Sequence, residues 1–205
     1  VLEVPLGGTA VGTGLNAPPG FADRALAAIA DRTGIALTRP TDAFEAQSTR
    51  DALVELSGCL RTLAVSMMKV CNDLRWMGSG PMTGLAEIHL PDLQPGSSIM
   101  PGKVNPVIPE VVNQIAFEVI GNDVTVSFAA EAGQLQLNAF EPIIAHSLFK
   151  SVMHLRNGCD TLRARCVTGI SANREHLRHT VENSIGIVTA LNPYIGYAHA
   201  TQVAQ

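Results

Sequence analysis

The chain has 205 residues, 46% of them hydrophobic, and is long enough to bury a sizeable core as one large domain or two small ones. Its net charge of -4 and its 14 scattered Lys and Arg residues show no basic stripe that would neutralise phosphates, which argues against a nucleic-acid partner. No apolar run reaches the roughly 18 to 20 residues that span a bilayer, and the first residues lack a signal core, so we expect a cytoplasmic protein without a membrane partner.

A glycine-rich run over residues 7–14 opens the chain and superficially resembles a phosphate-binding loop. A P-loop requires Gly-Lys-Ser/Thr after its four-residue gap, but here Gly12 is followed by Thr13. Nucleotide binding is therefore not expected.

The first expected helix is short. It runs from Phe21 to about Thr33 and ends at Gly34, a residue well suited to a left-handed cap. Pro40 then marks a break in the chain.

The second expected helix is long and spans residues 42–77. Asp42 can cap it, Glu45 follows three residues later, and no Gly or Pro interrupts it before Gly58. Its apolar residues alternate steps of three and four, which is typical of a helix in a coiled-coil-like bundle. This apolar seam consists of Leu53, Leu56, Leu60, Leu63, Met67, Val70, Leu74 and Met77.

Two more long helices are expected after a loop region with a possible short strand over residues 86–90. One has Pro106 or Pro109 in its first turn, where a missing amide hydrogen costs nothing, and the other starts near Pro142 and ends at Gly169. The residues expected to face a core are Val112, Ile115, Val119 and Val126 in the first, and Leu148, Val152, Leu155, Cys159, Leu162 and Cys166 in the second.

Helices of this length normally belong to bundles in which they pack along one another. The predicted fold class is therefore all-α: a long-helix bundle forms a central domain over residues 1–172. Residues 173–205 are expected to start a small helical C-terminal domain.

Cysteine and histidine give no metal or disulfide signature. The four cysteines form no Cys-x-x-Cys pair and their spacings suit buried helical positions, so reduced structural thiols are expected. His176 and His179 lie three apart, but no third ligand completes a metal site. Met67, Met68 and Met77 follow the heptad phase and are interpreted as core filler.

The segment richest in chemistry concentrates small residues, two hydroxyls, a cation and an amide just before an expected helix. Backbone amides and the positive end of that helix favour a carboxylate, Lys103 adds a charge, and Asn105 can donate from its amide. The functional interpretation is an anion-binding loop; composition alone favours an ordinary mobile loop with a Ser cap. The segment reads Gly96-Ser97-Ser98-Ile99-Met100-Pro101-Gly102-Lys103-Val104-Asn105-Pro106.

Residues 96–105 resemble the signature Gly-Ser-Ser-x-x-Pro-x-Lys-x-Asn of the fumarase/aspartase superfamily, and the match is complete. Residues 107–114 and 131–138 look like the aspartate ammonia-lyase (aspartase) branch. They depart from the Thr-Gln-Cys-Glu-like and Gly-Asn-Phe-Glu-Leu-Asn-like sequences typical of class II fumarases. The resemblance extends from residues 7–16 to residues 191–196 and so covers nearly the whole chain.

The resemblance implies a lyase that eliminates ammonia reversibly from L-aspartate to give fumarate, through an aci-carboxylate carbanion and without a metal or organic cofactor. It also implies a homotetramer whose long helices form a shared bundle, with each active site built from three subunits. Glu110 matches the glutamate that pairs with a substrate-site histidine of another subunit. The upstream site segments of the family lie before Val1, so this chain is expected to be an inactive piece of a longer polypeptide.

Roles carry over by position to the signature loop. Ser97 would be the general base that removes the Cβ proton, which demands an alkoxide whose pKa is strongly depressed. Lys103 and Asn105 would hold the carboxylate beside the reacting carbon and stabilise its developing charge. Ser98 and Met100 would add loop contacts to the substrate.

Two other functions stay open. A class II fumarase that hydrates fumarate to L-malate would use the same loop and bundle, and its mechanism cannot be separated from that of an ammonia-lyase here. The second open function is a non-catalytic helical scaffold of the same superfamily, as lens crystallins illustrate. The intact Ser97, Lys103 and Asn105 argue against the scaffold.

Overall fold

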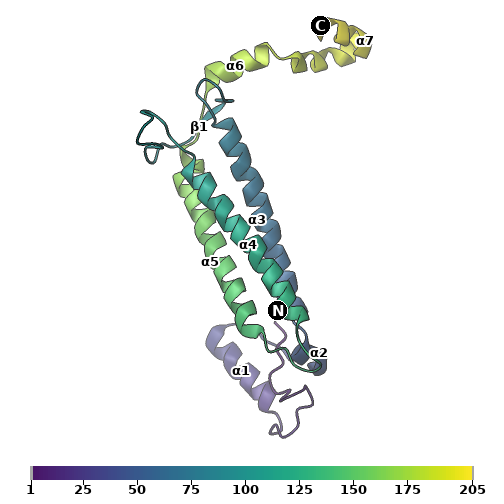
Figure 1. Ribbon diagram of the computed structural model, residues 1–205. Coiled ribbons are helices and arrows are strands. Elements are labelled where there is room, and N and C mark those ends of the chain that lie inside the picture. The colour runs from purple at the N-terminus through teal and green to yellow at the C-terminus, as the bar shows by residue number, and fades with distance from the viewer. Residues whose placement is uncertain (1, 205) are drawn as a thin grey trace. The chain divides into compact units, whose positions relative to one another are not determined.

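Helices dominate the protein in a computed structural model that describes residues 2–204 (Figure 1). Two short strands, β1 (Ile88–His89) and β2 (Ser171–Ala172), pair antiparallel. The all-α prediction is confirmed. The α-helices are α1 (Phe21–Thr33), α2 (Ala43–Ser48), α3 (Asp51–Met77), α4 (Val107–Glu131), α5 (Glu141–Arg165), α6 (Arg174–Glu182) and α7 (Asn192–Ala204), and the 3-10 helices are η1 (Val167–Gly169) and η2 (Ile185–Leu191).

The chain divides into two compact units. The first comprises residues 1–67 and 113–158, and the second comprises residues 68–112 and 159–205. Each of the long helices α3, α4 and α5 contributes residues to both units. The domain boundary expected between residues 172 and 173 stays a prediction.

The core of the first unit lies where α3, α4 and α5 pack side by side (Figure 1). Val126 and Ile144, from α4 and α5, are completely buried, and half-buried leucines of α3 pack against them. These leucines are Leu53, Leu56 and Leu60, three members of the predicted seam. The bundle prediction is confirmed here by its packing.

The α1 helix begins and ends where the sequence predicts. Gly34 adopts a left-handed conformation with φ of 72°, and its N–H donates to the Ala30 carbonyl at 2.8 Å. Ala22 and Leu26 form its buried face.

The α2 helix starts as predicted but is not continuous with α3. The Asp42 carboxylate accepts hydrogen bonds from the backbone N–H groups of Phe44 and Glu45, at 2.8 and 3.1 Å, and so caps α2. The helix stops at Ser48, because Thr49 is extended with φ of -102° and ψ of 168°. The prediction of one helix over residues 42–77 is therefore wrong.

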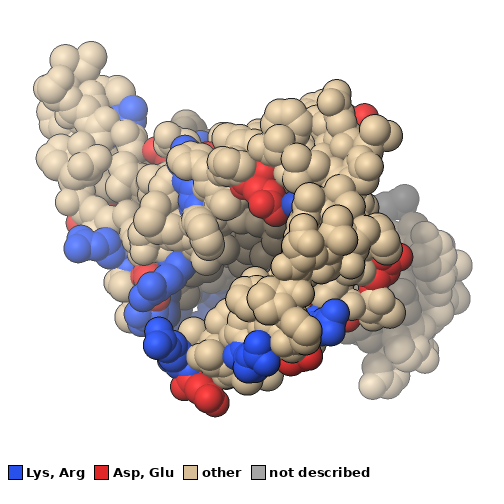
Figure 2. All heavy atoms as spheres, turned by 90° about the horizontal axis from the view of Figure 1, so that it is seen from below, with Lys and Arg blue, Asp and Glu red and all other residues tan. Residues whose placement is uncertain are grey.

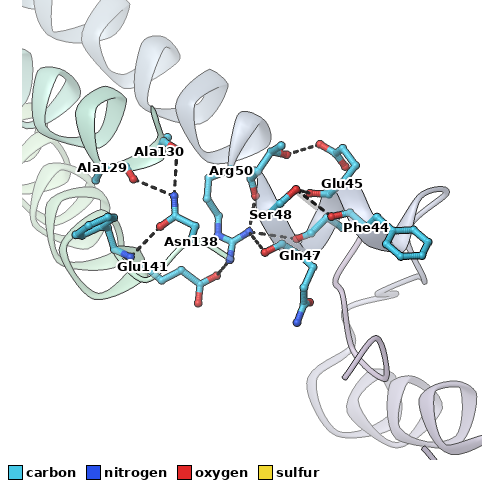
Figure 3. A network of polar contacts seen from close by, with 12 residues as sticks. Phe44, Glu45, Gln47, Ser48, Arg50, Ala129, Ala130, Asn138 and Glu141 are labelled. Carbon is cyan, nitrogen blue, oxygen red and sulfur yellow. Dashed lines mark hydrogen bonds and ion pairs between the residues drawn. The ribbon is translucent and has the colours of Figure 1, made fainter. Parts of the chain in front are cut away.

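The break between α2 and α3 depends on Arg50, whose side chain is 9% exposed. Its guanidinium donates to the carbonyls of Ala46 and Gln47 at 3.2 and 3.3 Å, and also to that of Thr49 (Figure 3). It also forms an ion pair with Glu141 at 2.6 Å. These bonds satisfy carbonyl oxygens that would have accepted backbone N–H bonds if the helix had continued.

The buried face of α3 is displaced by one residue from part of the predicted seam. Leu63 and Val70 are 45% and 50% exposed, whereas the neighbouring Ala64 and Cys71 are 0% exposed. Met67 and Leu74 are buried as predicted. Two adjacent stripes of α3, one through Leu63 and Val70 and one through Ala64 and Cys71, both follow the helical spacing of three and four residues. The stripe with the smaller side chains is the buried one.

The α4 and α5 helices follow most of the predicted pattern. Pro109 lies in the first turn of α4, and α5 starts at Glu141, beside Pro142. Ile115 is half-buried, and the burial prediction is wrong for Val152 and Cys159, which are exposed. The predicted core residues that are buried are Val112, Val119 and Val126 of α4, Leu148, Leu155 and Leu162 of α5, and Cys166 just beyond it.

All four cysteines lie in the described part of the chain, and none of them forms a disulfide. Cys71 and Cys166 are buried, but Cys59 and Cys159 are exposed, so only half of the cysteines occupy the expected buried positions. Burial, together with the neighbouring Cys166, raises the pKa of the Cys71 thiol to about 11. Burial also raises the pKa of Cys166.

In the second unit, β1 lies within the strand predicted over residues 86–90, but its partner β2 was not foreseen. Ile88 pairs with Ala172. The Asn173 side-chain amide donates to the Ala86 carbonyl at 3.0 Å, and the Asn173 backbone N–H donates to the Glu87 carbonyl at 2.9 Å. This pairing anchors the segment that leads from α3 to the signature loop.

Candidate active site

The signature loop, residues 96–105, is closed by short contacts between its two ends. The Gly96 N–H donates to the Lys103 carbonyl at 2.6 Å, and the Asn105 side-chain amide donates to the Gly96 carbonyl at 3.1 Å. Pro95 and Val104 form an isolated antiparallel bridge. The loop therefore brings the backbone next to Ser97 close to both Lys103 and Asn105.

Gly96 is the residue on which this closure depends. A Cβ atom at that position would lie 2.9 Å from the Asn105 Oδ1 and 3.0 Å from the Lys103 carbonyl oxygen. Any side chain there would push the two strands of the loop apart. The glycine that opens the signature is thus explained by close approach of the backbone.

Ser97 is half-buried, and its Oγ accepts hydrogen bonds from the backbone N–H groups of Ile99 and Met100, both at 3.2 Å. Two donors directed at one oxygen favour the anionic form of that oxygen over the neutral hydroxyl. A serine intended to accept a proton needs this arrangement. Sequence reasoning named Ser97 but not which amides of the loop would contact it.

The other loop residues are more exposed. Ser98, Met100 and Lys103 have exposed side chains, and Asn105 is half-buried. One hydrogen of the Asn105 amide already holds the loop through Gly96, so this residue has a structural task besides the one expected from the sequence.

Glu110 lies at the start of α4, where its N–H donates to the Pro106 carbonyl at 3.1 Å. Its carboxylate Oε1 is 3.6 Å from Nη2 of Arg75 in the last turn of α3, and the two side chains are 40% and 42% exposed. Sequence reasoning missed Arg75, because nothing in the spacing of residues 75 and 110 predicts that they meet.

A cavity of about 400 Å³ lies beside the C-terminal end of the signature loop. Both members of the Arg75–Glu110 pair line it, together with Val104 and Pro106 on either side of Asn105. Its remaining lining residues are Asn72, Trp76, Gly78, Ser79 and Gly80. Of the residues expected to form the site, Glu110 alone lines this hollow, which is large enough for a small dicarboxylate. The other expected site residues, Ser97, Ser98, Met100, Lys103 and Asn105, do not line it.

Three other features concern different kinds of site: metal-ligand clusters, basic patches and membrane-spanning helices. Within residues 2–204, no three His, Cys, Asp or Glu side chains group so that they could hold a metal ion. On the face seen in Figure 2, Lys and Arg side chains are interrupted by acidic and uncharged ones. No helix in the described part of the chain is long and apolar enough to cross a membrane.

Comparison with known proteins places the chain among lyases. A lyase family model matches residues 1–121. The aspartate ammonia-lyase of Pseudomonas aeruginosa is 57% identical over 203 residues, which are 99% of this chain and 43% of that protein. The class II fumarate hydratase of Mycobacterium tuberculosis is 54% identical over 204 residues, again 99% of this chain and 43% of that protein.

Solved structures agree with these relatives. The class II fumarase of Schistosoma mansoni has a TM-score of 0.94 at 36% identity and is matched over 100% of this chain and 46% of its own. A fumarate lyase:delta crystallin of Brucella melitensis, bound to cobalt, has a TM-score of 0.92 at 51% identity, over 99% of this chain and 44% of its own. The chain thus spans less than half the length of these relatives, and with such similarity over nearly all its residues it belongs to the lyases of the fumarase/aspartase superfamily.

Proposed function

We propose that the polypeptide containing this chain is an aspartate ammonia-lyase, which reversibly eliminates ammonia from L-aspartate to give fumarate. The observation that carries the proposal is the signature loop, in which the Ser97 Oγ accepts two backbone N–H bonds. Together with the intact Lys103 and Asn105 of the same loop, this arrangement favours catalysis over a non-catalytic scaffold.

In the proposed reaction Ser97, as an alkoxide, removes the Cβ proton of L-aspartate. The electron pair of the C–H bond moves into the adjacent carboxylate to give the aci-carboxylate, and then forms the double bond as the C–N bond breaks and ammonia leaves. The N–H groups of Ile99 and Met100 support the alkoxide before the proton is transferred. A positioned base of this kind contributes on the order of 10²- to 10⁴-fold to the rate.

Lys103 and Asn105 are proposed to bind the carboxylate that accepts this charge. The exposed Lys103 ammonium can reach an anion in front of the loop, and the second hydrogen of the Asn105 amide can donate to it. Because the negative charge on this carboxylate grows in the transition state, both contacts accelerate the chemical step. Ser98 and Met100 supply further loop contacts, and Glu110 supports the site by pairing with a histidine from another subunit.

The choice of L-aspartate over L-malate is based on the segments 107–114 and 131–138, which look like those of aspartases. Class II fumarase is the second candidate, because the Mycobacterium tuberculosis enzyme is 54% identical to this chain and the Pseudomonas aeruginosa aspartate ammonia-lyase only slightly more, at 57%.

The test is to measure fumarate formation by absorbance on the full-length polypeptide that contains residues 1–205, with L-aspartate and L-malate as substrates. We expect L-aspartate to be deaminated and L-malate not to be dehydrated at a comparable rate. If L-malate is the faster substrate, the aspartase assignment is wrong and the fumarase assignment replaces it.

We also propose that the polypeptide is a homotetramer with composite active sites. In the first unit, α4 exposes Phe117, Val124 and Phe128, whose spacings of seven and four residues place them along one face. An exposed apolar stripe of this kind is typical of a surface that another chain covers. Sedimentation of the full-length polypeptide should give the mass of four copies, and a monodisperse monomer would contradict the assembly.

A further inference from the structure

The pair formed by Arg75 and Glu110 lies at the border between the signature loop and α4. Arg75 belongs to the last turn of α3, and Glu110 to the start of α4. Their side chains approach to 3.6 Å between Nη2 and Oε1. Both line the cavity that also touches Val104 and Pro106, the two neighbours of Asn105.

We propose that Arg75 is a positioning residue that holds the Glu110 carboxylate in one orientation at the edge of the active site. The inference rests on the proposed function, in which Glu110 supports the site, and it adds a residue to which the signature assigns no role. Arg75 acts through Glu110 and does not itself bind the substrate.

The physical argument compares what this ion pair can do for stability with what it can do for geometry. A half-exposed pair at 3.6 Å contributes little to the free energy of folding, because solvent screens it. The long Glu110 side chain is itself 40% exposed, so solvent leaves room for more than one of its rotamers. A cation on a second helix favours the rotamers that bring the carboxylate toward the guanidinium. A displacement of about 1 Å in a group that positions the reactants can cost roughly 10²-fold in rate.

The helix N-terminus reinforces this assignment. Glu110 lies in the first turn of α4, where the helix dipole attracts a carboxylate toward the helix axis and the backbone amides. Arg75 attracts the same carboxylate toward the last turn of α3 instead. Removing the guanidinium should therefore change the orientation of the Glu110 carboxylate, because the pull that opposes the helix dipole is lost.

The test uses four variants of the full-length polypeptide: Arg75→Gln, Arg75→Lys, Glu110→Gln and the double variant Arg75→Gln/Glu110→Gln. The matched control is Arg156→Gln, which removes an exposed arginine of α5. For each variant, kcat and KM are measured with L-aspartate, and circular dichroism during heating verifies that the fold is intact.

We expect Arg75→Gln to lower kcat by about tenfold to hundredfold with KM changed by less than about threefold, because binding contacts are kept while geometry is lost. Arg75→Lys should recover part of the kcat, since it keeps a positive charge near Glu110. The double variant should lose no more kcat than Glu110→Gln alone, because Arg75 acts only through Glu110. Arg156→Gln should match the wild type.

Three outcomes would overturn the role of Arg75: an unchanged kcat in Arg75→Gln, losses that multiply in the double variant, or a raised KM at constant kcat, which would mean direct substrate binding. A wild-type polypeptide that turns over neither L-aspartate nor L-malate would overturn the proposed function, and this role with it. An active wild type with an unaffected Arg75→Gln variant would overturn the Arg75 proposal alone.

Discussion

The loops at the two ends of α4 are stabilised by different kinds of contact. The loop after α4 is anchored from inside by Asn138, whose side chain is 3% exposed. Its amide donates to the carbonyls of Ala129 and Ala130 at 2.9 and 3.1 Å, and its side-chain oxygen accepts from the Phe140 N–H at 2.8 Å (Figure 3). This asparagine thus closes the C-terminal end of α4 and the start of α5 together.

The signature loop before α4 is held by contacts among its own residues. Asn105 is only half-buried and makes one such bond, to Gly96, while Lys103 and Ser98 remain exposed. In the proposed function this loop presents polar groups to a substrate, and such groups cannot be buried. Similar asparagine bonds thus anchor a buried helix end after α4 and close the proposed substrate-binding loop before it.

Substitution of Ser97 is expected to cause the greatest loss of activity. Ser97→Ala in the full-length polypeptide should lower kcat by about 10²- to 10⁴-fold or more while the fold stays intact, because the base is lost. Ser98→Ala, which removes the exposed neighbouring hydroxyl, is the control and should cost less. Equal losses at both positions, or no loss at Ser97, would remove Ser97 as the base.

The next effect is expected at Lys103. Lys103→Met should reduce kcat/KM by about tenfold to hundredfold, because hydrogen bonds to charged groups contribute roughly 1.5 to 3 kcal/mol. Turnover and binding should both weaken, since the charge meets the carboxylate before and during the reaction. Lys69→Met, at an exposed lysine of α3, is the control. Unchanged kcat and KM would exclude Lys103 from the site.

The two asparagines provide the direct test of the comparison. Asn138→Ala should lower the free energy of unfolding by about 2 to 3 kcal/mol, because it leaves buried polar groups without partners. Asn105→Ala should lower it by less than about 1 kcal/mol, but should reduce kcat strongly. Urea denaturation and fumarate absorbance measure the two quantities. If both variants lose the same stability, the two loops do not differ as described.

The smallest effect is expected at Glu141, the partner of Arg50. Glu141→Gln should lower the free energy of unfolding by less than about 1 kcal/mol, and less still at high salt, because the Glu141 side chain is 60% exposed. Arg50→Ala should cost more, since the buried guanidinium also caps α2. Equal costs would show that the ion pair, and not the cap, holds the break between α2 and α3.

Much of this protein was predictable from local sequence. Gly34 ends α1 and Asp42 caps α2, because a left-handed cap and a carboxylate cap require only the residue and its near neighbours. The three long helices follow from apolar spacing. The signature loop could be identified because its chemistry depends on consecutive residues.

The mistakes arose where distant residues decide the outcome. The break at Thr49 is capped by the Arg50 guanidinium, whose ion-pair partner Glu141 lies 91 residues later in the chain. The buried stripe of α3 contains Ala64 and not Leu63, because packing selected between two stripes of equal periodicity. Hydrophobicity alone cannot make this choice, since burial depends on the shape of the facing helices.

Local sequence was enough to predict the presence of three long helices, the caps at Gly34 and Asp42 and the residues of the signature loop, since each depends on neighbours in the chain. Tertiary packing determines which helix faces are buried. It also brings β2 next to β1 and Arg75 next to Glu110. Such contacts join residues dozens of positions apart. They form only when the helices pack, because close approach in three dimensions leaves no periodic trace in either segment.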